Sequence, residues 1–220
     1  MTAEGTAGDQ LAGDPRVPDF FGAAWTVVSG FDSLLRRDGV VRGLVGPREL
    51  DRLWERHLLN SAAAAAFLPE TGTVIDLGSG AGLPGIVLAG MRPDVEFVLL
   101  EPMLRRTTWL NEVIEALDLA NARVVRGRAE DVAGSVVADA VTSRAVASLD
   151  KLYAWTAPLL RPGGELIALK GERAAEEIRQ GEATGRRLGF AGARLDDAYT
   201  IEGVDATRVV RARWKGRSVR

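Results

Sequence analysis

Val74-Ile75-Asp76-Leu77-Gly78-Ser79-Gly80-Ala81-Gly82-Leu83-Pro84-Gly85, continuing into the apolar run Ile86-Val87-Leu88-Ala89, is the stretch that decides the fold. An apolar run of strand length is broken by alternating glycines, and apolar residues then resume with helical spacing. Pro84 suits the start of that helix, where a missing N–H costs nothing. The stretch therefore predicts a buried strand, a tight turn and a helix, an arrangement whose glycines and free N–H groups suit a nucleotide ligand.

The glycines alone leave two cofactor classes open. Gly80-x-Gly82-x-x-Gly85 satisfies the dinucleotide fingerprint, so a nicotinamide cofactor and S-adenosylmethionine both fit. Asp76 separates them, because an acid on the strand before the first glycine suits an ammonium group and repels a pyrophosphate. We therefore predict S-adenosylmethionine, with a purely structural glycine turn as the alternative.

Composition limits the architecture and the chemistry. With 220 residues and 46% hydrophobic side chains, the chain can build one α/β core with a small extension. A net charge of −2 means that any nucleic-acid surface must come from local arginine clusters. The absence of cysteine excludes disulfides, cysteine-ligated metal and a thiolate nucleophile. We expect a monomeric cytoplasmic protein without a bound metal and without a membrane segment.

The rest of the chain divides into three parts. Residues 1–19 are small and polar, which predicts a disordered tail without the features of a signal peptide. Residues 20–69 carry apolar residues at helical spacing and predict two helices, the second starting at Pro47. Residues 70–220 predict further strands at 96–100, 122–126, 138–142 and 165–169 alternating with helices, and then a hairpin of 193–201 and 207–214. The predicted fold class is α/β, a mainly parallel seven-stranded sheet with a terminal antiparallel hairpin and an N-terminal helical extension, which is the outline of the Rossmann-like methyltransferases.

Polar residues at the ends of successive strands are the candidates for ligand binding, because an open α/β sheet binds its ligand there. Glu101 closes the second strand and could accept both hydroxyls of a ribose; a helix cap or a surface acid is the alternative. Ala129 and Glu130 follow the third strand and could read an adenine ring, although acids there also suit a helix N-terminus. Arg144 follows the fourth strand and could hold a carboxylate or a phosphate, or form a surface salt bridge.

Five motifs together resemble a known family: His57-Leu58-Leu59-Asn60-Ser61, the glycine stretch 74–85, Arg128-Ala129-Glu130, Ser143-Arg144-Ala145 and Lys170-Gly171. Their order and spacing are similar to those of the bacterial 16S ribosomal RNA guanine-7 methyltransferases, called RsmG or GidB. The resemblance implies that S-adenosylmethionine binds at Gly78, Leu83, Ala129, Glu130 and Arg144. It also implies that the substrate is 16S ribosomal RNA or the small ribosomal subunit, and that the product is 7-methylguanine in that RNA. The chain differs from the family at Asn60, at the Arg105-Arg106 pair and at Trp109.

The reaction chemistry agrees with that resemblance. Methylation of a pyrimidine carbon normally needs a cysteine, and exocyclic amines are usually methylated beside an Asn/Asp-Pro-Pro-aromatic turn; this chain has neither. The 7-nitrogen of guanine has a free lone pair and no proton to lose, so catalysis can rest on proximity and orientation. We nominate no general base, and name Arg144, Lys170 and His57 as positioning candidates, although a helical histidine is more often structural. A small-molecule methyltransferase and a non-catalytic nucleotide-binding regulatory module remain alternatives.

Arginines are the candidates for contact with RNA phosphates. Arg105 and Arg106 follow Glu101 and should lie near the mouth of the cofactor site, with a solvated helix face as the alternative. Lys170 ends the fifth strand and could orient the RNA or the base, or form a salt bridge at the strand end. Solvated helix faces are the alternative for further basic candidates, which are Arg36, Arg37, Arg42, Arg48, Arg52 and Arg56 in the helical extension, and Arg208, Arg211, Arg213, Lys215, Arg217 and Arg220 near the C-terminus.

Overall fold

The computed structural model describes residues 9–216, and within them the strands form one seven-stranded sheet with the order β3-β2-β1-β4-β5-β7-β6. The strands are β1 (Gly72–Leu77), β2 (Val95–Glu101), β3 (Ala122–Arg126), β4 (Ala138–Arg144), β5 (Leu160–Lys170), β6 (Arg194–Ala198) and β7 (Thr207–Arg213). β1 to β5 pair in parallel, whereas β7 runs antiparallel to both β5 and β6. The predicted fold class is confirmed, and β7 lies inside the sheet between β5 and the edge strand β6.

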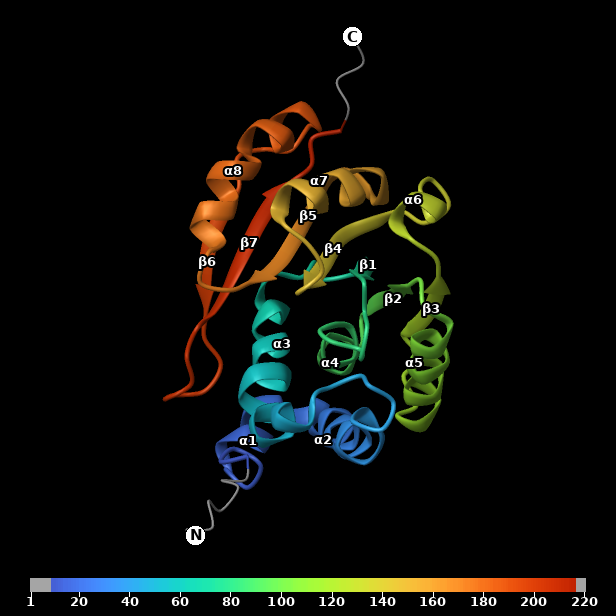
Figure 1. Ribbon diagram of the computed structural model, residues 1–220, viewed down its shortest axis with the longest axis vertical. Coiled ribbons are helices and arrows are strands. Elements are labelled where there is room, and N and C mark those ends of the chain that lie inside the picture. Colours follow the sequence, from blue (N-terminus) through green and yellow to red (C-terminus); the bar gives the residue numbers. More distant parts are fainter. Residues whose placement is uncertain (1–8, 217–220) are drawn as a thin grey trace.

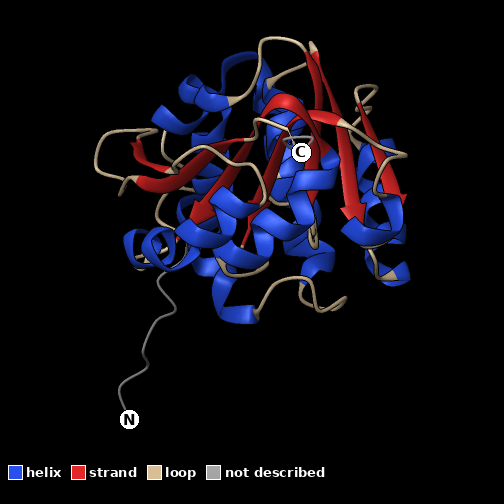
Figure 2. Cartoon of the chain, turned by 90° about the horizontal axis from the view of Figure 1, so that it is seen from above, coloured by secondary structure: helices blue, strands red, loops and turns tan. Residues whose placement is uncertain are grey.

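Helices cover both faces of the sheet, and Figure 2 shows the strands between two layers of helix. The helices after β1 are α4 (Gly85–Met91), α5 (Leu104–Ala116), α6 (Ala129–Val132), α7 (Leu149–Thr156) and α8 (Ala174–Arg187). The period of two along β1 sends Val74 to the core shared with α4 and α5, and Ile75 to the core shared with α6 and α7. Both faces are therefore buried, as expected for a parallel sheet.

The N-terminal helices pack on the face that carries α4 and α5 (Figure 1). They are α1 (Arg16–Phe21), α2 (Trp25–Leu34) and α3 (Asn60–Ala62), extended by the 3-10 or π-helical segments η1 (Gly22–Ala24), η2 (Leu35–Gly39), η3 (Pro47–Arg52), η4 (Trp54–Leu59) and η5 (Ala63–Phe67); η6 (Ala157–Leu159) follows α7. Phe31, Leu35 and Leu58 are fully buried in this core. Because these helices share one core with the sheet, the division at residue 70 stays a prediction about domain organisation.

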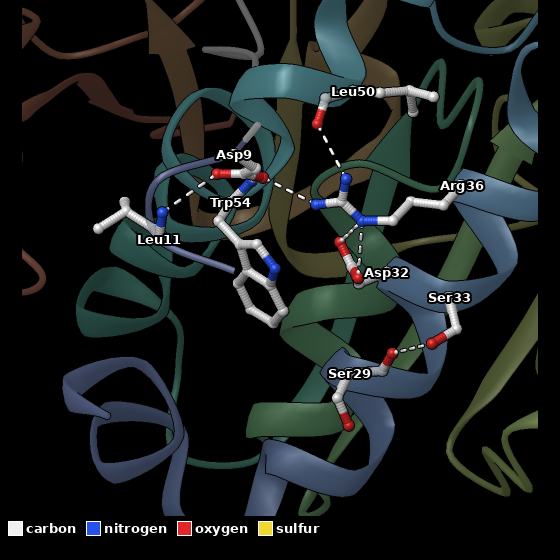
Figure 3. Close-up of polar contacts among 8 residues, drawn as sticks. All are labelled: Asp9, Leu11, Ser29, Asp32, Ser33, Arg36, Leu50 and Trp54. Atoms are coloured by element: carbon white, nitrogen blue, oxygen red, sulfur yellow. Dashed lines mark hydrogen bonds and ion pairs between the residues drawn. The ribbon is translucent and has the colours of Figure 1, made fainter. Parts of the chain in front are cut away.

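Part of the segment predicted as a disordered tail is ordered by Asp9 (Figure 3). Its carboxylate oxygen Oδ2 accepts a hydrogen bond from the Arg36 guanidinium at 2.8 Å and from the backbone N–H of Trp54 at 2.9 Å. Arg36 also pairs with Asp32 at 2.9 Å and donates to the carbonyl oxygen of Leu50. These partners lie 27 and 45 residues from Asp9 in the sequence. The tail prediction is therefore wrong for residues 9–19, while residues 1–8 lie outside the described part of the chain.

None of the helices in residues 9–216 is long and apolar enough to cross a membrane.

Candidate active site

A cavity of about 550 Å³ lies at the carboxyl ends of β1, β2, β3 and β4. This volume is in the range of small-molecule and cofactor sites. Its lining includes most of the residues predicted to bind a cofactor: Gly78, Gly80, Leu83, Glu101, Ala129, Glu130 and Arg144. Residues that the sequence did not indicate are Pro102, Met103, Val146 and Trp155, which add apolar surface without a motif of their own. The structure thus brings together residues from four separate strand ends.

The glycine corner needs glycine where its backbone turns. Gly78 and Gly80 have φ of 71° and 56°, a region that side chains with a Cβ disfavour, and both line the cavity. Gly82 has φ of 108°, but a Cβ there would meet Ile86 and Phe31 at 2.8 and 3.0 Å. Gly82 therefore allows close packing under the turn, and it does not line the cavity.

Asp76 is the second predicted cofactor residue outside the cavity lining. Its side chain is fully buried on the α4 side of the sheet, where Oδ2 accepts a hydrogen bond from the Gly85 N–H at 3.0 Å. Oδ1 accepts a longer one from the Thr142 hydroxyl at 3.4 Å. Burial raises the pKa of Asp76 to about 6. The Asp76 carboxylate therefore accepts the hydrogen bond of the N–H group at the start of α4. The sequence suggested this N–H as a donor to a ligand, but in the structure it is already paired.

Glu101 organises the part of the cavity that lies at the end of β2. Its two carboxylate oxygens accept hydrogen bonds from the backbone N–H groups of Gly80 and Met103, each at 3.0 Å. Its side chain is only 2% exposed. A carboxylate offers about four acceptor positions, so two remain for a ligand diol. Glu101 can therefore hold the glycine turn and still accept the hydroxyls of a ribose.

The predicted RNA pair Arg105 and Arg106 divides between two environments. Arg105 is exposed, whereas Arg106 lines the cavity, with a guanidinium nitrogen 3.7 Å from the Glu101 carboxylate. The Nε of Arg106 is buried without a hydrogen-bond partner among the described residues. Successive residues on a helix point about 100° apart, which explains the split. The pair therefore borders the cofactor cavity as well as the surface.

The segment after β4 connects this cavity with a second one. Ala145 has φ of 56°, a strained value for a residue with a Cβ, so the chain turns sharply directly after Arg144. Arg144, Ala145 and Val146 line both cavities. Burial lowers the pKa of Arg144 to about 10. At neutral pH Arg144 is still a cation at the border between the two spaces.

The second cavity, of about 780 Å³, has a mixed charged lining. It is bordered by the basic residues Arg52, Arg56, Arg144, Lys170 and Arg173 and by the acidic residues Glu55, Glu176, Glu177 and Asp205. Lys170 donates hydrogen bonds from Nζ to the Ala147 carbonyl at 2.6 Å and to Glu177 at 2.7 Å. Lys170 therefore anchors the loop after β4, and its ammonium group is already paired.

His57 lies on η4 and contacts one residue of η3 and one residue of β4. Its Nε2 is 2.7 Å from a Glu49 carboxylate oxygen and its Nδ1 is 3.0 Å from the Arg144 guanidinium. Burial, followed by the Arg144 cation, lowers the pKa of His57. Of the three positioning candidates, Arg144 and Lys170 therefore line the second cavity, and Arg144 also lines the first. His57 lines neither cavity and acts on them only through its contact with Arg144.

The structure also bears on the remaining basic candidates for RNA contact and on metal binding. Arg36, Arg37, Arg42, Arg52, Arg56 and Arg211 each lie within 4 Å of a carboxylate, which leaves less of their charge for RNA. Arg217 and Arg220 lie outside the described residues. No group of three or more His, Asp or Glu side chains in residues 9–216 could hold a metal ion.

Solved structures that share this fold at low sequence identity include proteins that bind S-adenosylmethionine. A SAM-dependent O-methyltransferase from Thermotoga maritima matches with a TM-score of 0.58, 13% identity and coverage of 79% of this chain and 72% of that one. TYW2 from M. jannaschii, solved in complex with AdoMet, matches with a TM-score of 0.54 and 19% identity, covering 71% and 74%. Sheet order and cavity position thus define a Rossmann-like methyltransferase fold.

Sequence comparison identifies the family. The family model "rRNA small subunit methyltransferase G" (GidB) matches residues 27–194. A protein of Thermobifida fusca named ribosomal RNA small subunit methyltransferase G is 51% identical over 197 residues, covering 86% of this chain and 83% of that protein. One of the same name from Streptomyces coelicolor is 53% identical over 180 residues, covering 80% and 75%. The chain belongs to the rRNA small subunit methyltransferase G family.

Proposed function

We propose that this chain transfers a methyl group from S-adenosylmethionine to the 7-nitrogen of a guanine in 16S ribosomal RNA. The observation that carries the proposal is the pair of adjoining cavities that meet at Arg144, Ala145 and Val146. One has the size and the buried acid that a nucleoside cofactor needs, and the other is lined by charged side chains. Membership of the rRNA small subunit methyltransferase G family supports the RNA substrate.

The residues of the first cavity fit the cofactor. Glu101 retains acceptors for the ribose hydroxyls, and Gly78 and Gly80 let the ligand approach the backbone closely. Ala129 and Glu130 start α6 at the end of β3, where an adenine ring would meet a backbone N–H and a carboxylate. When bound, the cofactor supplies a methyl group on a positively charged sulfur.

The reaction balances without a proton acceptor. The lone pair of the guanine 7-nitrogen forms the new bond to the methyl carbon, and the electrons of the broken carbon–sulfur bond stay on sulfur. The positive charge moves from sulfur to the guanine, so no net charge is created and no proton is released. The protein then needs to bind and orient both partners along one line, which proximity and orientation can supply.

Arg144 is the residue that we expect to orient the acceptor, because it lines both cavities. Guanine carries its O6 oxygen beside the 7-nitrogen, and a guanidinium can donate to O6. A bidentate contact would also engage the 7-nitrogen and block the reaction. Arg144 already donates to the Arg56 carbonyl at 3.1 Å and to His57, so its own protein contacts limit how it can present donors to a base.

Methyl transfer to ribosomal particles tests the proposal. Small subunits and free 16S RNA from a strain lacking the protein are incubated with labelled S-adenosylmethionine, and the modified nucleoside is identified after digestion. We expect 7-methylguanosine, and subunits from the complemented strain should accept no further label. Cofactor binding without turnover would favour a regulatory module, and transfer only to small acceptors would favour a small-molecule enzyme; either result refutes the proposal.

A further inference from the structure

Three side chains form a continuous hydrogen-bonded chain from the helical extension to the border of the two cavities. Glu49 on η3 contacts Nε2 of His57 on η4 at 2.7 Å, and Nδ1 of His57 contacts the terminal nitrogen Nη2 of Arg144 on β4 at 3.0 Å. The other terminal nitrogen of Arg144, Nη1, donates to the Arg56 carbonyl at 3.1 Å. Two residues of the helical extension, Arg56 and His57, therefore contact the guanidinium of Arg144, which comes from the sheet.

The chemistry of the groups assigns the proton positions. A guanidinium has only donors, so Nδ1 of His57 must accept the bond from Arg144. The ring proton of the neutral histidine then lies on Nε2, where it is donated to the Glu49 carboxylate. Both ring nitrogens are engaged within the protein, so neither is free to take a proton from a substrate. This arrangement agrees with a reaction that needs no general base.

We propose that His57, oriented by Glu49, is a positioning residue that holds the Arg144 guanidinium at the border of the two cavities while the imidazole is neutral. The inference rests on the proposed function only for its effect on methyl transfer; the proton positions stand independently. Its basis is the geometry of the chain and the location of Arg144 in the lining of both cavities.

Protonation of His57 would break the hydrogen bond between its Nδ1 and Arg144. A proton on Nδ1 would place an N–H against a guanidinium N–H, and two donors cannot share a hydrogen bond. The charged groups acting on His57 are Arg144 from β4 and Arg56 from its own helix, which lower its pKa, and Glu49 from η3, which raises it. Burial is the largest cause, and the result is a pKa below the ordinary 6.5. The contact with Arg144 is therefore intact at neutral pH and lost in mild acid.

Two amide substitutions separate the roles of the two ring nitrogens. In His57→Asn the amide oxygen can lie near the position of Nδ1 and accept from Arg144, but the shorter side chain does not reach Glu49. In His57→Gln the amide nitrogen can reach Glu49, but no acceptor remains at the position of Nδ1. Glu182→Gln is the control for introducing an amide side chain on a helix, because Glu182 pairs only with Arg186 on α8 among the described ion pairs and lies outside both cavity linings.

Turnover of ribosomal subunits is measured for these variants from pH 5 to 8.5, with thermal unfolding of each variant as the check on folding. At pH 7.5 we expect the kcat of His57→Asn to exceed that of His57→Gln at least 5-fold, with affinity for S-adenosylmethionine changed less than 3-fold. The wild type and Glu182→Gln should lose activity together in mild acid, and His57→Asn should lack that loss. Equal activities of Asn and Gln variants of equal stability would overturn the inference.

A readout without turnover keeps the inference separate from the proposed function. His57 is the single histidine of the chain, so nitrogen-15 labelling of histidine gives one pair of ring signals. We expect Nε2 to be protonated and Nδ1 unprotonated at pH 7.5, and Arg144→Met to raise the pKa of His57 because it removes a neighbouring cation. A proton on Nδ1 at pH 7.5, or an unchanged pKa in Arg144→Met, would overturn the inference even in an inactive protein. An inactive wild type with the expected signals would instead refute the proposed function.

Discussion

Asp76→Asn should stabilise the fold at neutral pH. Asp76 is fully buried, and its pKa is raised from 3.8 to about 6, with burial as the main cause. The folded state holds the Asp76 proton more tightly than the unfolded state does. The stabilising contribution of this proton to the free energy of unfolding is therefore fully present below the unfolded pKa, and it is lost as pH rises through about 6. Two pKa units correspond to about 3 kcal/mol, which is the cost of an ionised Asp76 at pH 7.5.

Asparagine removes the charge and fits the observed hydrogen bonds. Its oxygen can accept from the Gly85 N–H, and its amide can donate to the Thr142 hydroxyl, which is able to accept. Urea unfolding should show a gain of up to about 3 kcal/mol at pH 7.5 that shrinks toward pH 5, where the wild-type carboxyl is protonated. Asp94→Asn, on an exposed turn before β2, makes the same chemical change and should have little effect.

The same variant decides between two interpretations of Asp76. The structure places the side chain outside the cavity lining, so calorimetry should show an affinity for S-adenosylmethionine within a few-fold of the wild type. A loss of stability at pH 7.5 would refute the reasoning from burial. A large loss of cofactor affinity with unchanged stability would restore the interpretation from sequence, in which Asp76 binds the cofactor's ammonium group.

Four further substitutions test the two cavities and the adjoining surface. Glu101→Ala removes a buried carboxylate and leaves two backbone N–H groups without their acceptor, so calorimetry should show cofactor affinity weakened by about 1.5–3 kcal/mol; unchanged affinity would exclude the ribose contact. Arg105→Ala should keep cofactor affinity and make the slope of log RNA affinity against log salt shallower by roughly 0.7, whereas Arg106→Ala should weaken cofactor binding about 10-fold; identical behaviour of the two would contradict their separate environments. Lys170→Met should lower turnover of ribosomal subunits about 10-fold at unchanged cofactor affinity, because it releases the loop after β4, and full activity would show that this anchor is dispensable.

Local patterns in the sequence predict most of the fold. Alternating glycines between two apolar runs predicted β1, the turn and α4, and the run of strand-length and helix-length segments predicted the parallel sheet. Chain direction placed Glu101 and Arg144 at the same edge, because parallel strands end together. These features depend on residue spacing of a few positions, which a sequence displays directly.

Contacts between distant segments were decided only by the tertiary structure. Asp76 lies on the α4 face of β1 and satisfies the first N–H of that helix, so an acid expected in the cofactor cavity is buried beside it. His57 and Arg144 are 87 residues apart, and Asp9 joins partners on two different helical segments. The physical reason is that burial leaves polar groups no water to bind, so each takes whichever partner the packing of helices brings within reach. Spacing along the chain determined which strand ends meet, and packing determined which side chains line the cavity.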